Sequence, residues 1–190
     1  FLTTAGGDVR RLKLAALFGM TYVGAPSIYY GDEIAMVGQH DPDCRRPFHW
    51  TWREEAERVE VHDYFSALAQ ARNELECLTR GDFETLLADG PVFAYRRGLG
   101  DEQVVVVLNA GEEPVTVSFD LGDAIADKIS DARSTEGVAL PRLRDLLTRD
   151  LVNIGVQNGG ANATITLPPL TGRAFAPVVT HIWLRPETDK

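Results

Sequence analysis

The chain has 190 residues, enough for one ordinary domain or for a small domain with part of a second. Hydrophobic residues make up 44% of it, which suits a globular core and argues against a disordered protein. The formal net charge of -9 disfavours nucleic acids and anionic membrane surfaces as partners, and no apolar run approaches the roughly 18 residues of a membrane span.

The two cysteines, Cys44 and Cys77, form neither a CxxC motif nor a disulfide framework. They favour two free thiols and a cytoplasmic location, while a single disulfide remains compatible with the sequence. The chain opens on Phe1, without an initiator methionine and without the basic and apolar regions of a signal peptide. We therefore expect that it begins inside a longer protein.

The first predicted element is a helix after Asp8, a residue type that caps helix N-termini. Apolar residues such as Leu12 and Ala16 follow at helical spacing, and further apolar positions widen this face, so we expect the helix to be buried on most sides. After Gly24, residues 25–30 form an apolar run that predicts a strand of a parallel sheet covered on both faces. A helix, a short connection and such a strand are half of a repeating βα unit.

A long charged loop, residues 31–52, follows the predicted strand. It contains four carboxylates, two arginines, two histidines and a cysteine. A barrel of parallel strands and helices presents its chemistry on loops of this kind, at the C-terminal ends of its strands. Loops of this length are usually functional or disordered, and the aromatic residues Phe48, Trp50 and Trp52 argue for order. We interpret the loop as one wall of a site.

A second helix is predicted over residues 56–78, where apolar residues recur at helical spacing and acidic residues near the start favour the positive end of the helix dipole. After Gly81 the pattern changes to short strand-like runs separated by turn residues, which predicts an antiparallel sandwich or barrel. The boundary between the two parts is expected at residues 79–81. Residues 121–147 stay ambiguous, and 140–147 fit a helical turn or an irregular segment. The strand-like runs are residues 83–87, 92–96, 103–108, 115–119, 163–167 and 174–179.

Two motifs in the first fifty residues carry a family resemblance. Residues 29–34, YYGDEI, and residues 41–47, DPDCRRP, resemble the last barrel strand and the following loop of the α-amylase family of glycoside hydrolases. The similarity is greatest to the cyclomaltodextrinase, neopullulanase and maltogenic amylase branch. Looser similarity to the C-terminal β-sandwich of that family extends over the later part of the chain, at residues 93–97, 105–109 and 167–173.

The resemblance implies that this chain is the C-terminal part of a larger enzyme. Residues 1–79 would be the last helices and strand eight of the catalytic (β/α)8 TIM barrel, and residues 80–190 the antiparallel β-sandwich called domain C. The family is retaining and needs two carboxylates beside the scissile bond, assisted by a third aspartate. The resemblance places all three upstream of Phe1, so we expect no catalytic residue in this chain and no activity from it alone. Two departures, Ala35 in place of a common glycine and His49 in place of a common proline, bear on substrate preference.

Asp41 and Arg45 are the candidate substrate-binding residues, because the aspartate and arginine of this motif line the donor side of the sugar cleft in the resembled branch. A carboxylate accepts sugar hydroxyls, a guanidinium donates to others, and the two can brace each other. The alternative is an ion pair that only stabilises the loop. Asp43 and Arg46 are expected to be structural.

Other polar and aromatic residues of the loop have simpler interpretations. Asp32 and Glu33 are adjacent on an extended segment, point to opposite faces and cannot form a facing acid/base pair, so we expect them to bind backbone or a neighbouring loop. Trp50 and Trp52 are expected to anchor the loop rather than to stack on a sugar ring. The histidines, cysteine and aspartates match no zinc pattern, so neither a metal nor a cofactor is expected.

The expected partners are an α-glucan or cyclodextrin oligosaccharide and the upstream barrel portion of the same protein, and a homo-oligomer is compatible with the sequence. A second hypothesis is a non-catalytic carbohydrate-binding β module. It is weakened because residues 100–180 contain only two aromatic residues, Phe119 and Phe175, both in runs suited to a core. A third hypothesis, a β domain that mediates oligomerisation, is compatible with the first.

Overall fold

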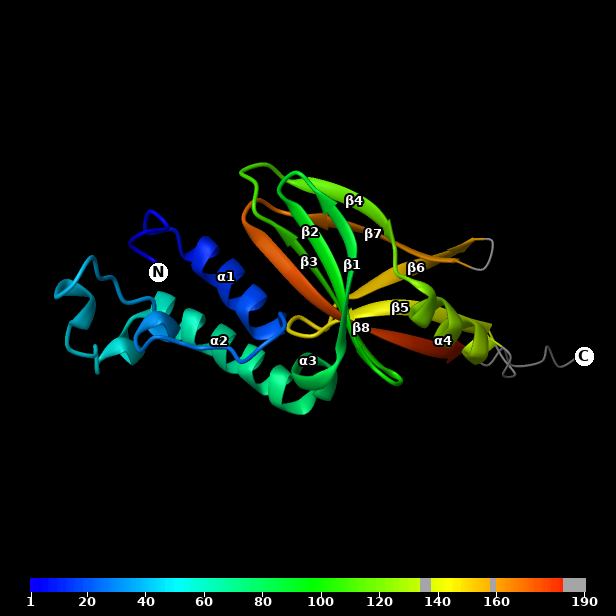
Figure 1. The fold of residues 1–190 in the computed structure, drawn as a ribbon, viewed down its shortest axis with the longest axis horizontal. Helices are drawn as coiled ribbons and strands as arrows, with labels where there is room; N and C mark the ends of the chain where they lie inside the picture. The colour runs from blue at the N-terminus through cyan, green and yellow to red at the C-terminus, as the bar shows by residue number, and fades with distance from the viewer. Residues whose placement is uncertain (134–137, 158–159, 183–190) are drawn as a thin grey trace, which may run out of the picture.

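A computed structural model of the chain describes residues 1–133, 138–157 and 160–182. A helical N-terminal part lies at one end, and a β-sheet part with one further helix forms the rest (Figure 1). The helices are α1 (Val9–Thr21), α2 (Ala56–Glu74), α3 (Glu76–Arg80) and α4 (Asp123–Arg133), with short 3-10 turns at Asp32–Ile34, Asp43–Arg45 and Trp52–Glu54. The strands are β1 (Asp82–Asp89), β2 (Val92–Leu99), β3 (Glu102–Asn109), β4 (Val115–Asp120), β5 (Val138–Asp145), β6 (Leu151–Gln157), β7 (Gly160–Leu167) and β8 (Thr171–Ile182).

The strands form one antiparallel sheet in the order β1-β2-β3-β8-β5-β6-β7-β4. The two edge strands, β1 and β4, contact each other, so the sheet curls into a nearly closed barrel (Figure 1). This architecture agrees with the antiparallel β part predicted from the short strands, and it is consistent with a β-sandwich domain.

Strand β3 shows why the β part has a hydrophobic core on each side of its sheet. Side chains alternate faces along a strand, so a run of consecutive valines supplies both faces. Val105 and Val107 point into the curled sheet, where they pack with Phe175 and with α4 residues. Val104 and Val106 point the other way, into a core shared with the first three helices. The helical part is therefore packed onto the sheet.

Helix α1 begins where the sequence predicts. The Asp8 carboxylate caps it and accepts a hydrogen bond from the Arg10 backbone amide at 2.9 Å. The predicted second helix is divided: α2 ends at Glu74, Leu75 adopts an extended conformation, and α3 follows. Helix α1 packs against α2 and against β8. Helix α1 approaches β8 closely at Gly172. A Cβ on this glycine would lie 2.7 Å from the Leu17 side chain of α1 and 2.6 Å from the Leu108 side chain of β3.

Two arginines join the end of α1 to the rest of the molecule. Arg97 on β2 is 1% exposed and donates to four backbone carbonyls, those of Thr21, Leu78, Gly81 and Asp82, each at 3.0 Å. Arg72 on α2 donates to the carbonyl of Met20 at 2.7 Å and to that of Gly24. Carbonyls at the end of a helix have no partner within it, so these side chains satisfy groups that would otherwise be buried unpaired.

One element differs clearly from the sequence prediction. Residues 25–30 form no strand: residues 25–29 have no regular secondary structure, Tyr30 begins a turn, and no neighbouring strand among the described residues pairs with them. A strand exists only through hydrogen bonds to a partner, so an apolar run cannot form one by itself. The expected last strand of a (β/α)8 barrel is therefore not formed in this structure.

The ambiguous segment 121–147 contains α4 and β5 rather than a helical turn at residues 140–147. Among the described residues, no helix has the length and apolar character needed to cross a membrane.

Candidate functional site

The structure brings together the two predicted substrate-binding residues. Arg45 Nε lies 2.9 Å from Asp41 Oδ1, and the two side chains are 71% and 63% exposed. Both lie at the tip of the loop, around the 3-10 turn Asp43–Arg45. Within the described ranges, the terminal nitrogens of Arg45 have no hydrogen-bond partner. The pair therefore has donors and acceptors available to a ligand, and it is braced as the sequence interpretation requires.

Asp43 and Arg46 form a second pair that is turned toward the loop itself. Asp43 accepts two hydrogen bonds from Arg46, at 2.7 and 2.8 Å, and one from the Gln39 backbone amide at 2.7 Å. These donors, Arg46 first, hold the pKa of the Asp43 carboxyl below its ordinary value. The structural role expected for this pair agrees with these contacts.

The acidic neighbours at the start of the loop also have local roles. Glu33 accepts a hydrogen bond from the Gly31 backbone amide at 2.7 Å, as expected for a carboxylate that fixes the backbone. Asp32 is partly buried, and desolvation raises the pKa of its carboxyl. The Tyr30 hydroxyl donates to the Arg46 carbonyl at 2.9 Å, which ties the tip of the loop back to its start.

The two tryptophans behave differently. Trp52 is 7% exposed and stacks on the His62 ring at 4.4 Å, so it anchors the loop to α2 as expected. Trp50 is 80% exposed and packs only edge-on against Phe48, with ring centroids 4.8 Å apart. The structure shows no anchoring contact of Trp50 beyond Phe48 among the described residues, so its expected role as an anchor stays a prediction.

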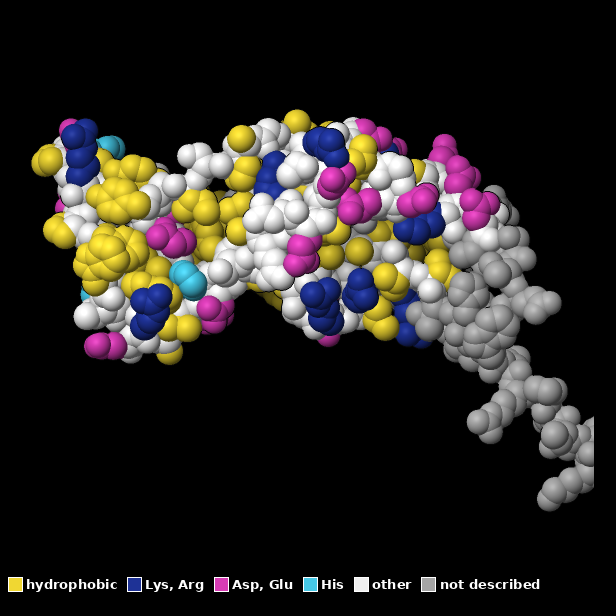
Figure 2. Space-filling view, turned by 90° about the horizontal axis from the view of Figure 1, so that it is seen from below, with side chains coloured by type: hydrophobic (Ala, Val, Ile, Leu, Met, Phe, Trp, Pro, Cys, Tyr) yellow, Lys and Arg dark blue, Asp and Glu magenta, His cyan; other side chains and the backbone are white. Residues whose placement is uncertain are grey.

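The helical part exposes large apolar side chains. Figure 2 shows large hydrophobic side chains gathered on this end of the molecule. Five large hydrophobic side chains of this part, four between the end of α1 and the loop and one within the loop, are 43 to 54% exposed: Val23, Ile28, Tyr29, Tyr30 and Val37. Contiguous apolar surface of this kind usually marks a region that another part of a protein covers.

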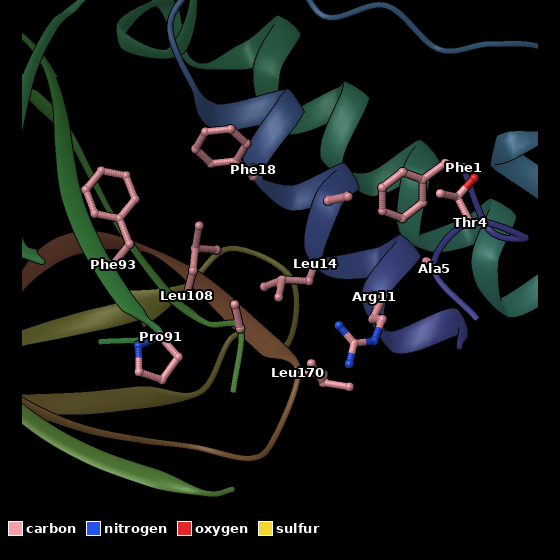
Figure 3. A pocket seen from close by; sticks show the side chains of 12 residues that line it. Phe1, Thr4, Ala5, Arg11, Leu14, Phe18, Pro91, Phe93, Leu108 and Leu170 are labelled. Atoms are coloured by element: carbon pink, nitrogen blue, oxygen red, sulfur yellow. The ribbon is translucent and has the colours of Figure 1, made fainter. Parts of the chain in front are cut away.

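A groove of about 570 Å³ forms a second apolar surface, between α1 and the β part (Figure 3). Leu14 and Phe18 from α1 form one wall, and Phe93 and Leu108 form the opposite wall. Arg11 lies at the rim and pairs with Glu112. The groove thus has one charged pair at its edge and an apolar interior.

Both cysteines are free, as the sequence suggested. Cys77 is buried, and desolvation, reinforced by Glu102, raises the pKa of its thiol to about 12, so it is unreactive at neutral pH. Within residues 1–133, 138–157 and 160–182, no group of three or more His, Cys, Asp or Glu residues is arranged to hold a metal ion.

Comparison with known proteins identifies relatives of this chain. No family model matches the chain. It is 48% identical over 109 residues to a cyclomaltodextrinase of Thermoanaerobacter pseudethanolicus, a match that covers 57% of this chain and 19% of the relative. It is 44% identical over 119 residues to neopullulanase 2 of Thermoactinomyces vulgaris, covering 62% of this chain and 20% of the relative.

The matches lie in the C-terminal region of these relatives. The chain is related to the α-amylase family. In agreement, the crystal structure of a debranching enzyme from Nostoc punctiforme superposes with a TM-score of 0.69 at 28% identity, covering 93% of this chain and 33% of that enzyme. The chain thus spans about a fifth of the first curated relatives and a third of this α-amylase-family structure.

Proposed function

We propose that the chain is the C-terminal portion of a retaining glycoside hydrolase that cleaves α-glucans. In this proposal residues 1–79 complete the catalytic (β/α)8 barrel, and residues 80–190 form its C-terminal β domain. The observation that supports it most is the exposed apolar surface of the helical part, in a chain whose matches cover only about a fifth of the first curated relatives.

The unpaired apolar segment 25–30 supports the barrel assignment. Its backbone has no strand partner among the described residues, and Ile28, Tyr29 and Tyr30 are each more than 40% exposed. A neighbouring parallel strand on each side would pair its backbone, and surrounding helices and barrel residues would cover its side chains. The groove beside α1 offers a second apolar surface for the same upstream portion.

The role proposed for the loop is to bind the sugar chain through Asp41 and Arg45. The exposed, braced pair at the loop tip supports this, since it leaves donors free for hydroxyl groups. The exposed ring of Trp50 adds an apolar surface of the kind that packs on pyranose faces. Bond cleavage itself is assigned to two carboxylates and an assisting aspartate upstream of Phe1, which act across the scissile bond.

A carbohydrate-binding role for the β part alone lacks support. Its two aromatic residues between 100 and 180, Phe119 and Phe175, are 6% and 0% exposed, so neither can stack on a sugar.

Two measurements test the proposal. Purified chain of residues 1–190 should not hydrolyse cyclodextrin or maltooligosaccharides, while the full-length enzyme does so under the same conditions. Hydrolysis by the chain alone would overturn the assignment. Calorimetric titration of the chain with maltoheptaose should show no binding at millimolar concentration, and clear binding would instead favour an independent carbohydrate module.

A further inference from the structure

The cleft loop, defined here as residues 36–48, carries the proposed sugar-binding pair and is closed at its base by one side chain of α2. Arg58 lies in the first turns of α2 and is 23% exposed. Its Nη1 donates to the carbonyl of Ile34 at 2.8 Å and to that of Ala35 at 3.2 Å, the two residues that precede the loop.

The same guanidinium also reaches the other end of the loop. Arg58 Nε donates to Glu55 Oε2 at 2.7 Å, and the second oxygen of Glu55 contacts His49 Nε2. His49 is the first residue after the loop. Arg58 and Glu55 therefore connect the entry of the loop to its exit; Arg58 lies on α2, and Glu55 is the residue immediately before that helix.

The backbone at the entry requires such support. Ala35 has φ 53° and ψ 41°, a left-handed conformation that is unfavourable for a residue with a Cβ. Strained conformations persist where surrounding contacts fix them. The carbonyl that follows this strained position is one of the two that Arg58 binds, so the arginine stabilises the turn that sets the direction of the loop.

We propose that Arg58 is a positioning residue that holds the Asp41–Arg45 pair in place for sugar binding. This inference rests on the sugar-binding role proposed for the pair. Other contacts fix the interior of the loop: Tyr29 and Tyr30 bind the carbonyls of Cys44 and Arg46, and the Gly38 amide donates to Thr3 at 2.9 Å. Arg58 is the contact from α2 that joins the two ends of the loop.

The test compares three variants of the full-length enzyme. Arg58→Met keeps the aliphatic stem and removes every donor. Arg58→Lys keeps the charge, but a single ammonium cannot span two carbonyls and Glu55 with the geometry of a planar guanidinium. Arg80→Met is the control, because Arg80 is an exposed arginine on α3 that pairs only locally, with Glu76.

Two readouts are measured: amide hydrogen exchange of residues 36–48, and the kinetic constants on maltooligosaccharides. We expect Arg58→Met to accelerate amide exchange in the loop. We also expect it to raise KM roughly fivefold with little change in kcat, because a fivefold loss of binding corresponds to the net free energy of about one hydrogen bond. Arg58→Lys should fall between this variant and wild type, and Arg80→Met should match wild type in both readouts.

The contrary outcomes separate the two proposals. If the amides of residues 36–48 exchange at the wild-type rate in both Arg58→Met and Arg58→Lys, the positioning role is overturned. Faster exchange with an unchanged KM would overturn the sugar-binding role on which the inference rests. If Arg58→Met does not fold, Arg58→Lys decides by the same two readouts, because it keeps both charge and stem.

Discussion

At the scale of single residues, buried arginines help to join the two parts of the molecule. Arg97 donates to four carbonyls at the end of α1, the end of α3 and the start of β1. We expect Arg97→Met to lower the free energy of unfolding by about 3 kcal/mol, because buried carbonyls would lose their donors. Urea unfolding followed by circular dichroism measures this. The control Arg80→Met should unfold like wild type, and an equally small effect at Arg97 would contradict the account.

The exposed Arg45 is expected to act on substrate and not on stability. Its side chain is 71% exposed and its contact is the ion pair with Asp41. In the full-length enzyme, Arg45→Ala should raise KM for maltooligosaccharides several-fold and leave the urea unfolding midpoint unchanged, since exposed ion pairs contribute little to stability. Unchanged kinetic constants would refute the substrate-binding assignment.

Asp43 gives a prediction about pH. Arg46 lowers the pKa of its carboxyl below the ordinary value of 3.8, so the contribution of this pair to loop order is fully present above about pH 4. It is lost as the pH falls through the lower, folded-state pKa. The carboxyl carbon of Asp43 in an NMR titration should have a midpoint below 3.8, and Arg46→Gln should move that midpoint upward. A midpoint at or above 3.8 in wild type would show that the pair does not form.

At the scale of elements, the contact between α1 and β8 depends on the absence of one side chain. Gly172→Ala would place a methyl group 2.6 Å from Leu108 and 2.7 Å from Leu17, so we expect a loss of about 1 to 3 kcal/mol in the free energy of unfolding. Gly155→Ala on β6 is the matched control, because its nearest neighbouring atom would be 3.7 Å away. Equal stability of the two variants in urea would show that α1 is not packed against β8 as described.

Elements with local signals could be predicted from the sequence. The Asp8 cap and the apolar period gave the start of α1, and the turn residues between short apolar runs gave the antiparallel β part. Elements that depend on distant partners could not be predicted. The carbonyls bound by Arg72, Arg97 and Arg58 carry no sequence signature, and the break at Leu75 interrupts a continuous helical pattern.

In the candidate site, too, features with a local motif could be predicted, and features that join distant residues could not. The Asp41–Arg45 pair was found through its motif, and the structure brings the two side chains together. The bracket formed by Arg58, Glu55 and His49 was not foreseen, since it joins α2 to both ends of a loop. The apolar run 25–30 can form the predicted strand only if another strand lies beside it. None of the strands among the described residues pairs with it.

At the scale of the whole molecule, a β part with its own core is joined to a helical part that exposes apolar surface. The relatives and the exposed residues Val23, Ile28 and Tyr29 agree in pointing to a larger enzyme around this end. The purified chain should therefore bind a hydrophobic dye and self-associate at micromolar concentration, as exposed apolar surface promotes. The full-length enzyme should not show the dye binding.

The central claim is that residues 25–30 become a covered barrel strand in the full-length protein. Amide hydrogen exchange of these residues, compared between the chain and the full-length enzyme, tests it most directly. Unpaired extended amides exchange at nearly the free rate, while amides of a central strand are protected up to the global stability. The account predicts slowing by at least about a thousandfold in the full-length enzyme, corresponding to about 4 kcal/mol of opening free energy. Equally fast exchange in both proteins would contradict it.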